Sequence, residues 1–522
     1  MANLAESRVP ARAGAFVQAE AQFAQILSDL SSKEAGTMTH SDLERKLTEE
    51  GRELLRLLLQ EHLDLRGPGE STGPVRDAQG RERSQPPRLH ERRLGSVFGP
   101  VEIRRMGYGG EGLASLHPLD GELNLPRELY SLELRRRAAE EAAKGSIDEA
   151  VESLGRQSGT KVPKRQLEEL VVRAAVDFDD FYQQRSLSAE AATDLLMVLS
   201  FDGKGVVMHR QDLREATRKA AEKKKHKLNK RLTKGEKRNS KRMATVATVY
   251  TIAPWVRTPE NVARGLAPIH AVETGKRPRP ENKRVWASLV KTPEEVIEQA
   301  FEEAQKRDPT HEKTWVALVD GNKTQLAILP RMARKYGVNL IVILDLIHVT
   351  EYLWKASTAF YEEKDPEREE WVGQKLLEIL RGHSSRVAGG IRRSATLRGL
   401  SVEEREAVDD CCDYLIDYAP YLRYDKYLAE GTPIATGVVE GACRHLVKDR
   451  MELTGARWRL VGAEAVLRLR ALRSSGDFDE YWRFHEEREY DRNHAARYAE
   501  HEVPTTKKPQ SQERKPHLRL VK

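Results

Sequence analysis

The chain has 522 residues, of which 39% are hydrophobic and 32% are charged, and its formal net charge is +7. At roughly 100–200 residues per domain this length predicts several structural units, and the hydrophobic fraction is enough for a packed core. The three cysteines, Cys411, Cys412 and Cys443, include no CxxC pair, so neither a disulfide framework nor a cysteine zinc site is expected.

The sequence carries no pattern typical of export or of membrane insertion. Residues 1–23 lack the continuous apolar stretch of a signal peptide, and no run of about 18 apolar residues occurs. We therefore expect no membrane partner and a reducing, cytoplasmic location. The small net charge is a weak indicator of a polyanionic partner, so the distribution of the charge matters more.

The first 126 residues combine a helical pattern with a short β pattern. Apolar residues recur at helical spacing over 16–65, which predicts helix. Residues 66–92 are rich in Gly, Pro and charge and are interpreted as a flexible linker or mobile loop. The segment 96–108 (SVFGPVEIRRMGY) predicts a β-hairpin with Gly99-Pro100 at its turn.

Residues 127–184 return to a helical pattern, with two short helices separated by a turn at 158–160. The second helix opens with Lys161, Lys164 and Arg165, and the pair is similar to a helix-turn-helix that binds DNA. An ordinary helical hairpin is the alternative, because short helical pairs are common in any α-rich protein.

From residue 194 the pattern changes to strands and then to alternating helices and strands, which indicates an α/β fold with a mixed sheet covered by helices. The expected strands are 194–203, 245–254, 314–321 and 338–345, and the expected helices are 293–307, 323–337, 349–363 and 437–451. Residues 364–430 have little β pattern and are interpreted as a helical insertion. The basic tail after about residue 501 is expected to be disordered.

Three carboxylates stand at notable places in this pattern. Asp202 and Asp320 each end an apolar strand and precede a glycine, and Glu440 lies in the first turn of a helix. Each alone has an ordinary explanation, since Asp-Gly starts many turns and the helix dipole favours a first-turn acid. Together they fit phosphodiester cleavage, in which two Mg²⁺ ions about 3.5–4 Å apart activate the nucleophile and hold the leaving oxygen. Mg²⁺ prefers hard oxygen ligands on stiff elements, so we expect these side chains to bind two Mg²⁺ ions, for which Mn²⁺ can substitute.

Four stretches of this part of the chain resemble a known family. FDGKGVVM, TWVALVDGN, ILDLIHVTEYLWKA and TGVVEGACRHLVKDRMELTGARW are similar to bacterial insertion-sequence transposases of the DDE type, related to the Mutator-like superfamily. The resemblance spans at least 195–460. It implies an RNase H-like core, a mixed five-stranded sheet with flanking helices, in which the helical insertion 364–430 separates the fifth strand from the catalytic glutamate.

The resemblance also implies roles for individual residues. Asp202, Asp320 and Glu440 would be the catalytic metal ligands, and Asp345 and His348, in an Asp-x-x-His motif after the fifth strand, would be an accessory pair. Asp345 also ends an apolar strand and is an alternative second ligand, although the glycine after Asp320 favours Asp320. A helix N-cap is the alternative for Asp345, and a hydrogen-bonded core imidazole is the alternative for His348.

The densest positive stretch is 214–242, which contains fourteen Lys and Arg and three acidic residues. It is inserted between the strand of Asp202 and the next strand, which favours contact with DNA phosphates over a solvated charge run. The residues expected to bind DNA there are Lys223, Lys224, Lys225, Lys227, Lys230, Arg231, Lys237, Arg238, Lys241 and Arg242.

A second group of DNA-binding residues is expected on and after the Glu440 helix: Arg444, Lys448, Arg457 and Trp458. At helical spacing Arg444 and Lys448 share a face with Glu440, and Trp458 offers a ring on which a base can stack. Pairing with Glu440 and Glu452 is the alternative for the two basic residues, and a core position is the alternative for Trp458.

The predicted organisation has seven parts. They are a helical region (1–65), a linker and β-hairpin region (66–126), a helical domain with the helix-turn-helix pattern (127–190), the first part of the catalytic core (194–363, with the basic insertion 212–243), the helical insertion (364–430), the second part of the core with the glutamate helix (431–475), and a C-terminal helix with a basic tail (476–522).

The expected function is that of an insertion-sequence DNA transposase, which hydrolyses the phosphodiester at the element ends and joins the freed 3′-hydroxyl to target DNA. The expected partners are double-stranded DNA, as terminal repeats and as target, and further copies of the chain in a homodimer or larger assembly at the bacterial nucleoid. The N-terminal helices would bind the terminal repeats or a sister subunit. The alternatives are a metal-dependent nuclease without the joining step, a domesticated, non-catalytic DNA-binding protein, and a basic RNA-associated protein.

Overall fold

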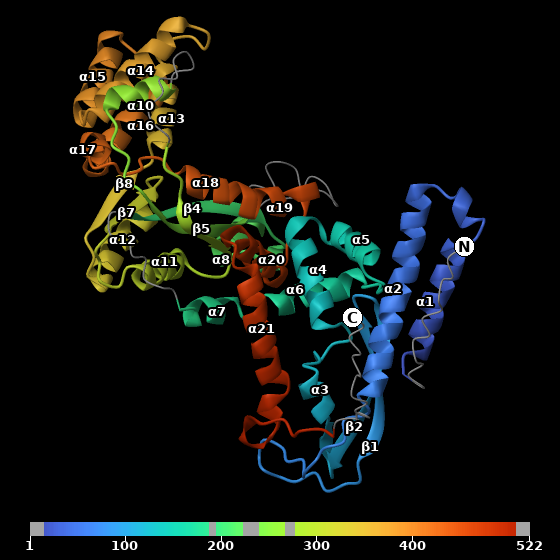
Figure 1. Cartoon of the computed structure of the whole chain (residues 1–522). Helices are drawn as coiled ribbons and strands as arrows, with labels where there is room; N and C mark the ends of the chain where they lie inside the picture. The colour runs from blue at the N-terminus through green and yellow to red at the C-terminus, as the bar shows by residue number, and fades with distance from the viewer. Residues whose placement is uncertain (1–14, 187–194, 223–239, 267–276, 508–522) are drawn as a thin grey trace, which may run out of the picture. The chain divides into compact units, whose positions relative to one another are not determined.

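The computed structural model describes residues 15–186, 195–222, 240–266 and 277–507 (Figure 1). The chain divides into two compact units, which we call the N-terminal unit (1–177 with 479–522) and the sheet unit (178–478). The three parts predicted over 1–190 therefore form one unit, except that α7 (Phe178–Gln184) belongs to the sheet unit. The C-terminal helix, α21 (Phe478–Asn493), joins the N-terminal unit rather than forming a separate part.

The N-terminal unit is mainly helical, as predicted, with a small antiparallel sheet. Its helices are α1 (Val17–Leu30), α2 (His40–Leu65), α3 (Pro118–Glu122), α4 (Leu132–Lys144), α5 (Ile147–Gln157), α6 (Lys164–Ala174) and α21, and its strands are β1 (Arg88–Ser96), β2 (Gly99–Gly110) and β3 (Leu113–Leu116). The sheet order is β1-β2-β3, and Leu94, Val101 and Ile103 form a core cluster with Leu119 and Leu125.

The β-hairpin is confirmed, but its turn lies two residues earlier than predicted. Ser96 pairs with Gly99, so the turn is Val97-Phe98, and Gly99 and Pro100 are the first residues of β2. Gly99 has a φ of 136°, a conformation that a residue with a side chain rarely adopts. The glycine is therefore needed beside the turn and not inside it.

The predicted flexible linker 66–92 is wrong: residues 88–92 belong to β1, and the segment 66–87, which contains no helix or strand, is packed. Val75 is buried against Tyr108 and Tyr498, and Asp77 is buried with its Oδ1 accepting hydrogen bonds from the backbone of Gln79 and Arg81. These contacts supply the apolar and polar partners that a free loop lacks. Residues 502–507, the described part of the predicted basic tail, also bond to this loop, whereas 508–522 lie outside the described residues.

The predicted pair of short helices is α5 and α6, which pack on α4. Ser146 and Glu149 form a capping box that begins α5, and the turn at 158–160 is held to the hairpin by a hydrogen bond from the Thr160 hydroxyl to the Ser96 carbonyl. The helices of a helix-turn-helix pattern are thus present, and their binding to DNA stays a prediction.

The sheet unit contains the mixed five-stranded sheet that was predicted, with the order β6-β5-β4-β7-β8. Its strands are β4 (Leu196–Val207), β5 (Lys241–Ile252), β6 (Glu281–Ser288), β7 (Thr314–Val319) and β8 (Leu340–Leu344). β4 is antiparallel to β5 and parallel to β7, β5 is antiparallel to β6, and β7 is parallel to β8. No residues were assigned to β6 from the sequence, because its first half is polar and exposed at the edge of the sheet.

Helices cover both faces of this sheet: α11 and α18 both pack on β4 and β5, and Figure 1 shows them on opposite sides. The helices are α8 (Glu215–Glu222), α10 (Pro259–Leu266), α11 (Pro293–Arg307), α12 (Lys323–Tyr336), α13 (Leu346–Ser357), α14 (Pro366–Leu380), α15 (Ser384–Leu397), α16 (Val402–Asp417), α17 (Tyr424–Ala429), α18 (Gly437–Ala442), α19 (Asp449–Met451) and α20 (Leu460–Ser475). α14 to α17 confirm that 364–430 is helical. None of the described helices is long and apolar enough to span a bilayer.

A buried histidine makes the N-terminal unit sensitive to acid. The Nε2–H of His494 donates to the Leu125 carbonyl at 2.9 Å, and burial lowers the pKa of His494 to about 4. An unfolded chain binds this proton near pH 6.5. Stability present above about pH 6.5 is therefore lost as the pH falls toward about 4, because only the unfolded state gains the proton there.

We expect calorimetry of the full chain to show the melting temperature of the N-terminal unit falling between pH 7 and pH 4.5. The variant His494→Gln keeps a donor for the Leu125 carbonyl but has no titrating group, so its melting temperature should fall less over that range. Equal pH slopes in the two proteins would contradict a contribution from His494.

Candidate metal centre

The predicted carboxylates lie near the carboxyl ends of the three parallel strands β4, β7 and β8. Asp320 directly follows β7, and Asp345 directly follows β8. Asp202 was predicted at the end of its strand and instead lies inside β4. The parallel pairing with β7 ends at Ser200↔Leu318, but the antiparallel pairing with β5 continues to Val207. Asp202 thus lies just past the end of the pairing with β7, where β4 is still paired with β5.

The chain turns sharply after Asp320. Gly321 has a φ of 94°, and a Cβ there would meet the side chains of Leu344 and Tyr414 at 3.3 Å. The Tyr418 hydroxyl, from the helical insertion, donates to the Gly321 carbonyl at 3.0 Å. The glycine that follows Asp320 is therefore required both by the backbone conformation and by the close packing.

Thr436 connects the end of β8 to the glutamate helix. Its backbone N–H donates to Oδ1 of Asp345 at 3.0 Å, and its hydroxyl donates to Oε1 of Glu440 at 3.3 Å. Glu440 lies in the first turn of α18, as predicted, with an exposed side chain. One buried threonine thereby holds the segment before α18 against Asp345 and orients the carboxylate of Glu440.

Cys443 connects the same helix to β4. Its Sγ donates to Oδ2 of Asp202 at 3.0 Å, and Oδ1 of Asp202 accepts from the Gly203 backbone N–H at 2.6 Å. Burial raises the pKa of the Cys443 thiol, with a further contribution from the Asp202 charge, so the thiol keeps its proton. Neither Thr436 nor Cys443 was recognised from the sequence, where the only available signal is their closeness to Glu440.

Asp202, Asp320 and Glu440 interact electrostatically. Burial raises the pKa of Asp320, and repulsion from Asp202 adds to that increase. Burial also raises the pKa of Glu440, and repulsion from Asp345 and from Asp202 adds to it. A bound cation stabilises the charged form of carboxylates whose pKa is raised by burial and by a neighbouring carboxylate.

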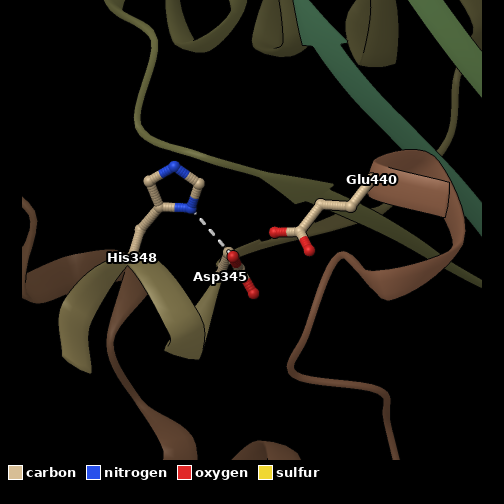
Figure 2. Close-up of side chains that lie close together, drawn as sticks. All are labelled: Asp345, His348 and Glu440. Atoms are coloured by element: carbon tan, nitrogen blue, oxygen red, sulfur yellow. Dashed lines mark hydrogen bonds and ion pairs between the residues drawn. The ribbon is translucent and has the colours of Figure 1, made fainter. Parts of the chain in front are cut away.

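Asp345 and His348 form a close pair, shown in Figure 2, in which the Nδ1 of His348 lies 2.9 Å from Oδ2 of Asp345. This hydrogen bond raises the pKa of His348 to about 9. Burial acts to raise the pKa of Asp345, but the hydrogen bonds from His348 and Thr436 outweigh it and the pKa is lowered. The pair is therefore an imidazolium and a carboxylate at neutral pH.

Glu440 belongs to two candidate sets of metal ligands, one with Asp202 and Asp320 and the other with Asp345 and His348. Among the described residues, the group whose ligand atoms all lie within 4.8 Å of one another is Asp345, His348 and Glu440 (Figure 2). Both oxygens of Asp345 already accept hydrogen bonds, from Ile347 and Thr436 on Oδ1 and from His348 on Oδ2, and its side chain is fully buried.

Asp320 differs from Asp345 in that one of its carboxylate oxygens accepts no hydrogen bond from the described residues. Its Oδ1 accepts from the Asn322 N–H at 2.9 Å, and no hydrogen bond within the described part of the chain reaches its Oδ2. Asp345 is the N-cap of α13, as one alternative predicted, and this cap begins the helix at Leu346 rather than at the predicted 349. The oxygen left without a hydrogen bond favours Asp320 as the second ligand, whereas the short distances among the ligand atoms of Asp345, His348 and Glu440 favour Asp345.

The predicted DNA-binding residues of the basic stretch fall into two groups. Lys223, Lys224, Lys225, Lys227, Lys230, Arg231, Lys237 and Arg238 lie outside the described residues. Lys241 and Arg242 begin β5, where Lys241 lies 3.6 Å from Glu452 and Arg242 donates to the carbonyls of Leu289 and Asp212. Arg242 therefore has a structural role that the sequence did not indicate.

The residues after Glu440 do not follow one continuous α-helix. A π-helical segment (Cys443–Lys448) joins α18 to α19, so the predicted helix 437–451 is interrupted and the spacing assumed for Arg444 and Lys448 does not hold. Both side chains are exposed, and Arg444 lies 3.8 Å from Asp449. Their binding to DNA stays a prediction, and they do not follow the continuous α-helical spacing that was assumed.

Trp458 has a structural role, in line with its alternative. Its backbone pairs with the end of β4, its Nε1–H donates to the Met451 carbonyl at 3.0 Å, and the Arg450 guanidinium lies over its ring. Arg457 beside it is exposed. The contact of Arg457 with DNA stays a prediction, and stacking of a base on Trp458 would require the ring to leave these contacts.

No protein-family model matches the chain, and no curated protein matches its sequence.

The raised pKa of His348 predicts a pH-dependent stability. A group whose folded-state pKa is raised from about 6.5 to about 9 contributes stability that is full below the unfolded pKa and is lost as the pH rises through about 9. In the absence of divalent metal, we expect the difference in melting temperature between the native chain and His348→Gln to be larger at pH 6 than at pH 9.5.

A matched control for this measurement is His40→Gln, which removes an exposed histidine of α2 that lies 3.5 Å from Glu44. A difference between native chain and His348→Gln that is the same at both pH values would show that the ion pair with Asp345 does not stabilise the fold.

Proposed function

We propose that the chain is a DDE-type DNA transposase with an RNase H-like core, which cuts and joins DNA with two divalent metal ions. The arrangement of the sheet unit supports this proposal. Asp202 lies on the central strand, Asp320 ends the neighbouring parallel strand, and Glu440 begins a helix that follows a helical insertion. The resemblance to insertion-sequence transposases implies the same order of elements.

The observation that carries the proposal is the coupling of Asp202, Asp320 and Glu440, which lie far apart in sequence. Burial raises the pKa of Asp320 and of Glu440, and the Asp202 carboxylate adds to both increases, so the three carboxylates lie close enough to interact although Asp202 and Glu440 are 238 positions apart, the difference between 440 and 202. A fold that brings like charges together at strand ends stores repulsion that a divalent ion relieves.

The donor set fits hard divalent ions. Asp202, Asp320 and Glu440 would hold Mg²⁺ or Mn²⁺ through carboxylate oxygens, and the second oxygens of Asp320 and Glu440 accept no hydrogen bond from the described residues. Bound ions would neutralise charge on the phosphate and lower the pKa of the attacking water or 3′-hydroxyl.

The remaining residues of the site would position these ligands. Cys443 holds one oxygen of Asp202, and Thr436 holds one oxygen of Glu440, so each carboxylate keeps a defined direction. The His348 imidazolium, oriented by Asp345, would donate its Nε2 proton to a phosphate oxygen beside the ligands. The exposed Arg444 and Lys448 would contact the DNA backbone next to Glu440.

We expect the purified chain to nick DNA that carries the ends of its own element in the presence of Mg²⁺ or Mn²⁺, and to join the freed ends to a second DNA. Asp320→Asn and Glu440→Gln keep the side-chain shapes but remove charged ligands, so each should reduce nicking by on the order of a thousandfold or more. The measurement is the rate of nick formation on end-labelled DNA.

Asp417→Asn is a matched control, because Asp417 is an exposed aspartate of the same unit on α16. Nicking that persists in the Asp320 and Glu440 variants would overturn the proposed site. Metal-dependent nicking without joining would instead identify a nuclease, and specific binding without any nicking would identify a non-catalytic DNA-binding protein.

A metal-binding measurement separates the two candidate ligand sets. If Asp320 is a ligand and Asp345 only orients its neighbours, Asp320→Asn should abolish tight Mn²⁺ binding, and Asp345→Asn should weaken it by about 10–100-fold. Mn²⁺ affinity of the full chain can be followed by the loss of the free-ion electron paramagnetic resonance signal.

The reverse order of effects would assign the ion to Asp345, His348 and Glu440. In that case His348→Gln should weaken Mn²⁺ binding as strongly as Asp345→Asn does, whereas Asp320→Asn should leave it nearly unchanged.

A further inference from the structure

Helix α2 carries a stripe of exposed leucines along one of its faces. The helix has 26 residues and is one of the longest that the structure describes. Its side chains Leu47, Leu55, Leu58 and Leu65 are each between 38% and 45% exposed. At about 100° per residue, Leu47, Leu58 and Leu65 fall within about 20° of one another around the helix axis, and Leu55 lies about 60° further round. We call these four residues the leucine stripe.

The leucine stripe is distinct from the faces of α2 that pack inside the N-terminal unit. Leu59 and Leu63 pack against the core cluster that contains Leu94, and their directions differ from those of Leu47, Leu58 and Leu65 by about 100° or more. Leu55, about 40° from Leu59, is the edge of the stripe nearest this cluster. Leu57 is buried and lies about 100° away on the other side. The stripe is therefore a third apolar face.

The spacing of the leucine stripe is symmetric, to within one residue, about position 56 of α2. Leu47 lies nine residues before position 56 and Leu65 lies nine residues after it, while Leu55 and Leu58 flank the same region. If two copies of α2 cross antiparallel there, Leu47 faces the Leu65 of the other copy and Leu55 faces its Leu58. Such a reciprocal pattern is what a two-fold symmetric interface requires, because residue i contacts j while j contacts i.

The residues between the leucines agree with this register. Gly51 and His62 lie on the same stripe, and Gly51 of one copy falls opposite His62 of the other, so that the position without a side chain meets an imidazole. A Cβ added at Gly51 would meet nothing within 4 Å in a single chain, so packing inside one chain does not explain this glycine. No Asp, Glu, Lys or Arg lies within the stripe between Leu47 and Leu65.

We propose that the leucine stripe is the contact surface for a second copy of this chain, formed by antiparallel pairing of two α2 helices. The leucine pairs extend over about 27 Å, from 18 residues at 1.5 Å each. Phe23 and Leu27 of α1, both about half exposed, add apolar surface to the same helical hairpin. The proposal concerns assembly alone and does not depend on the proposed catalytic function.

Interchain disulfides test the register directly. In a chain that carries both Leu47→Cys and Leu65→Cys, oxidation should link two copies, because each new cysteine faces its counterpart on the other helix. Leu47→Cys alone or Leu65→Cys alone should not link, since like positions lie far apart in an antiparallel pair. The two cysteines of one chain are about 27 Å apart on a single helix and cannot bond to each other. The three native cysteines are buried.

Molar mass gives an independent test. We expect light scattering at about 10 µM to give twice the 59.3 kDa of one chain, and Leu58→Glu to shift the mass to that of one chain. Leu55→Glu combined with Leu58→Lys should restore the pair, because each glutamate then faces a lysine of the other copy. The control is Leu129→Glu, at another exposed leucine of the N-terminal unit, which should stay dimeric.

A monomeric native chain at this concentration would overturn the proposal. Disulfide formation by either single cysteine variant as readily as by the double variant would overturn the antiparallel register. Unchanged helical circular dichroism in Leu58→Glu shows that the variant is folded, so that a loss of mass reports on assembly.

Discussion

The placing of like-charged carboxylates within β4, after β7 and in the first turn of α18 is the constraint on which the candidate site depends. Burial raises the pKa of Asp320 and of Glu440, and the Asp202 carboxylate adds to both increases. Two neutral donors hold these carboxylates, Cys443 on Asp202 and Thr436 on Glu440, and the nearby His348 acts to lower the pKa of Asp320 and of Glu440. Neutral donors hold carboxylates in place without neutralising them, so the negative potential stays available for a divalent ion.

The sequence was sufficient for elements whose signals are local. Helix α11 carries its own boundaries, because Thr292 and Glu295 form a capping box and Pro293 occupies its first turn. Elements that depend on partners distant in the sequence were harder to predict. The polar start of β6 reads as a loop until β5 is beside it, and the strand that holds Asp202 extends to Val207 only because β5 continues to pair with it.

The candidate site shows the same division. Strand-end aspartates and a first-turn glutamate form a pattern visible in the sequence, and the Asp-x-x-His spacing placed Asp345 and His348 one helical turn apart, within hydrogen-bond distance. Thr436 and Cys443 have no such pattern, because their partners are 91 and 241 residues away. The π-helical segment after Glu440 was likewise not predicted, and it breaks the α-helical spacing expected for Arg444 and Lys448.

The division of the N-terminal unit between the two ends of the chain has a consequence for biosynthesis. Asp177 bonds to buried His485, and Arg135 lies 2.9 Å from Glu489, so α21 supplies partners for charges that are buried near α4 and α6. About 300 residues separate these partners, which at roughly 5–20 residues per second delays the last helix by about 15–60 seconds on the ribosome. During that interval Asp177 lacks its partners His485 and Arg492, whereas Arg135 already has Glu128 as a counter-charge and lacks only Glu489.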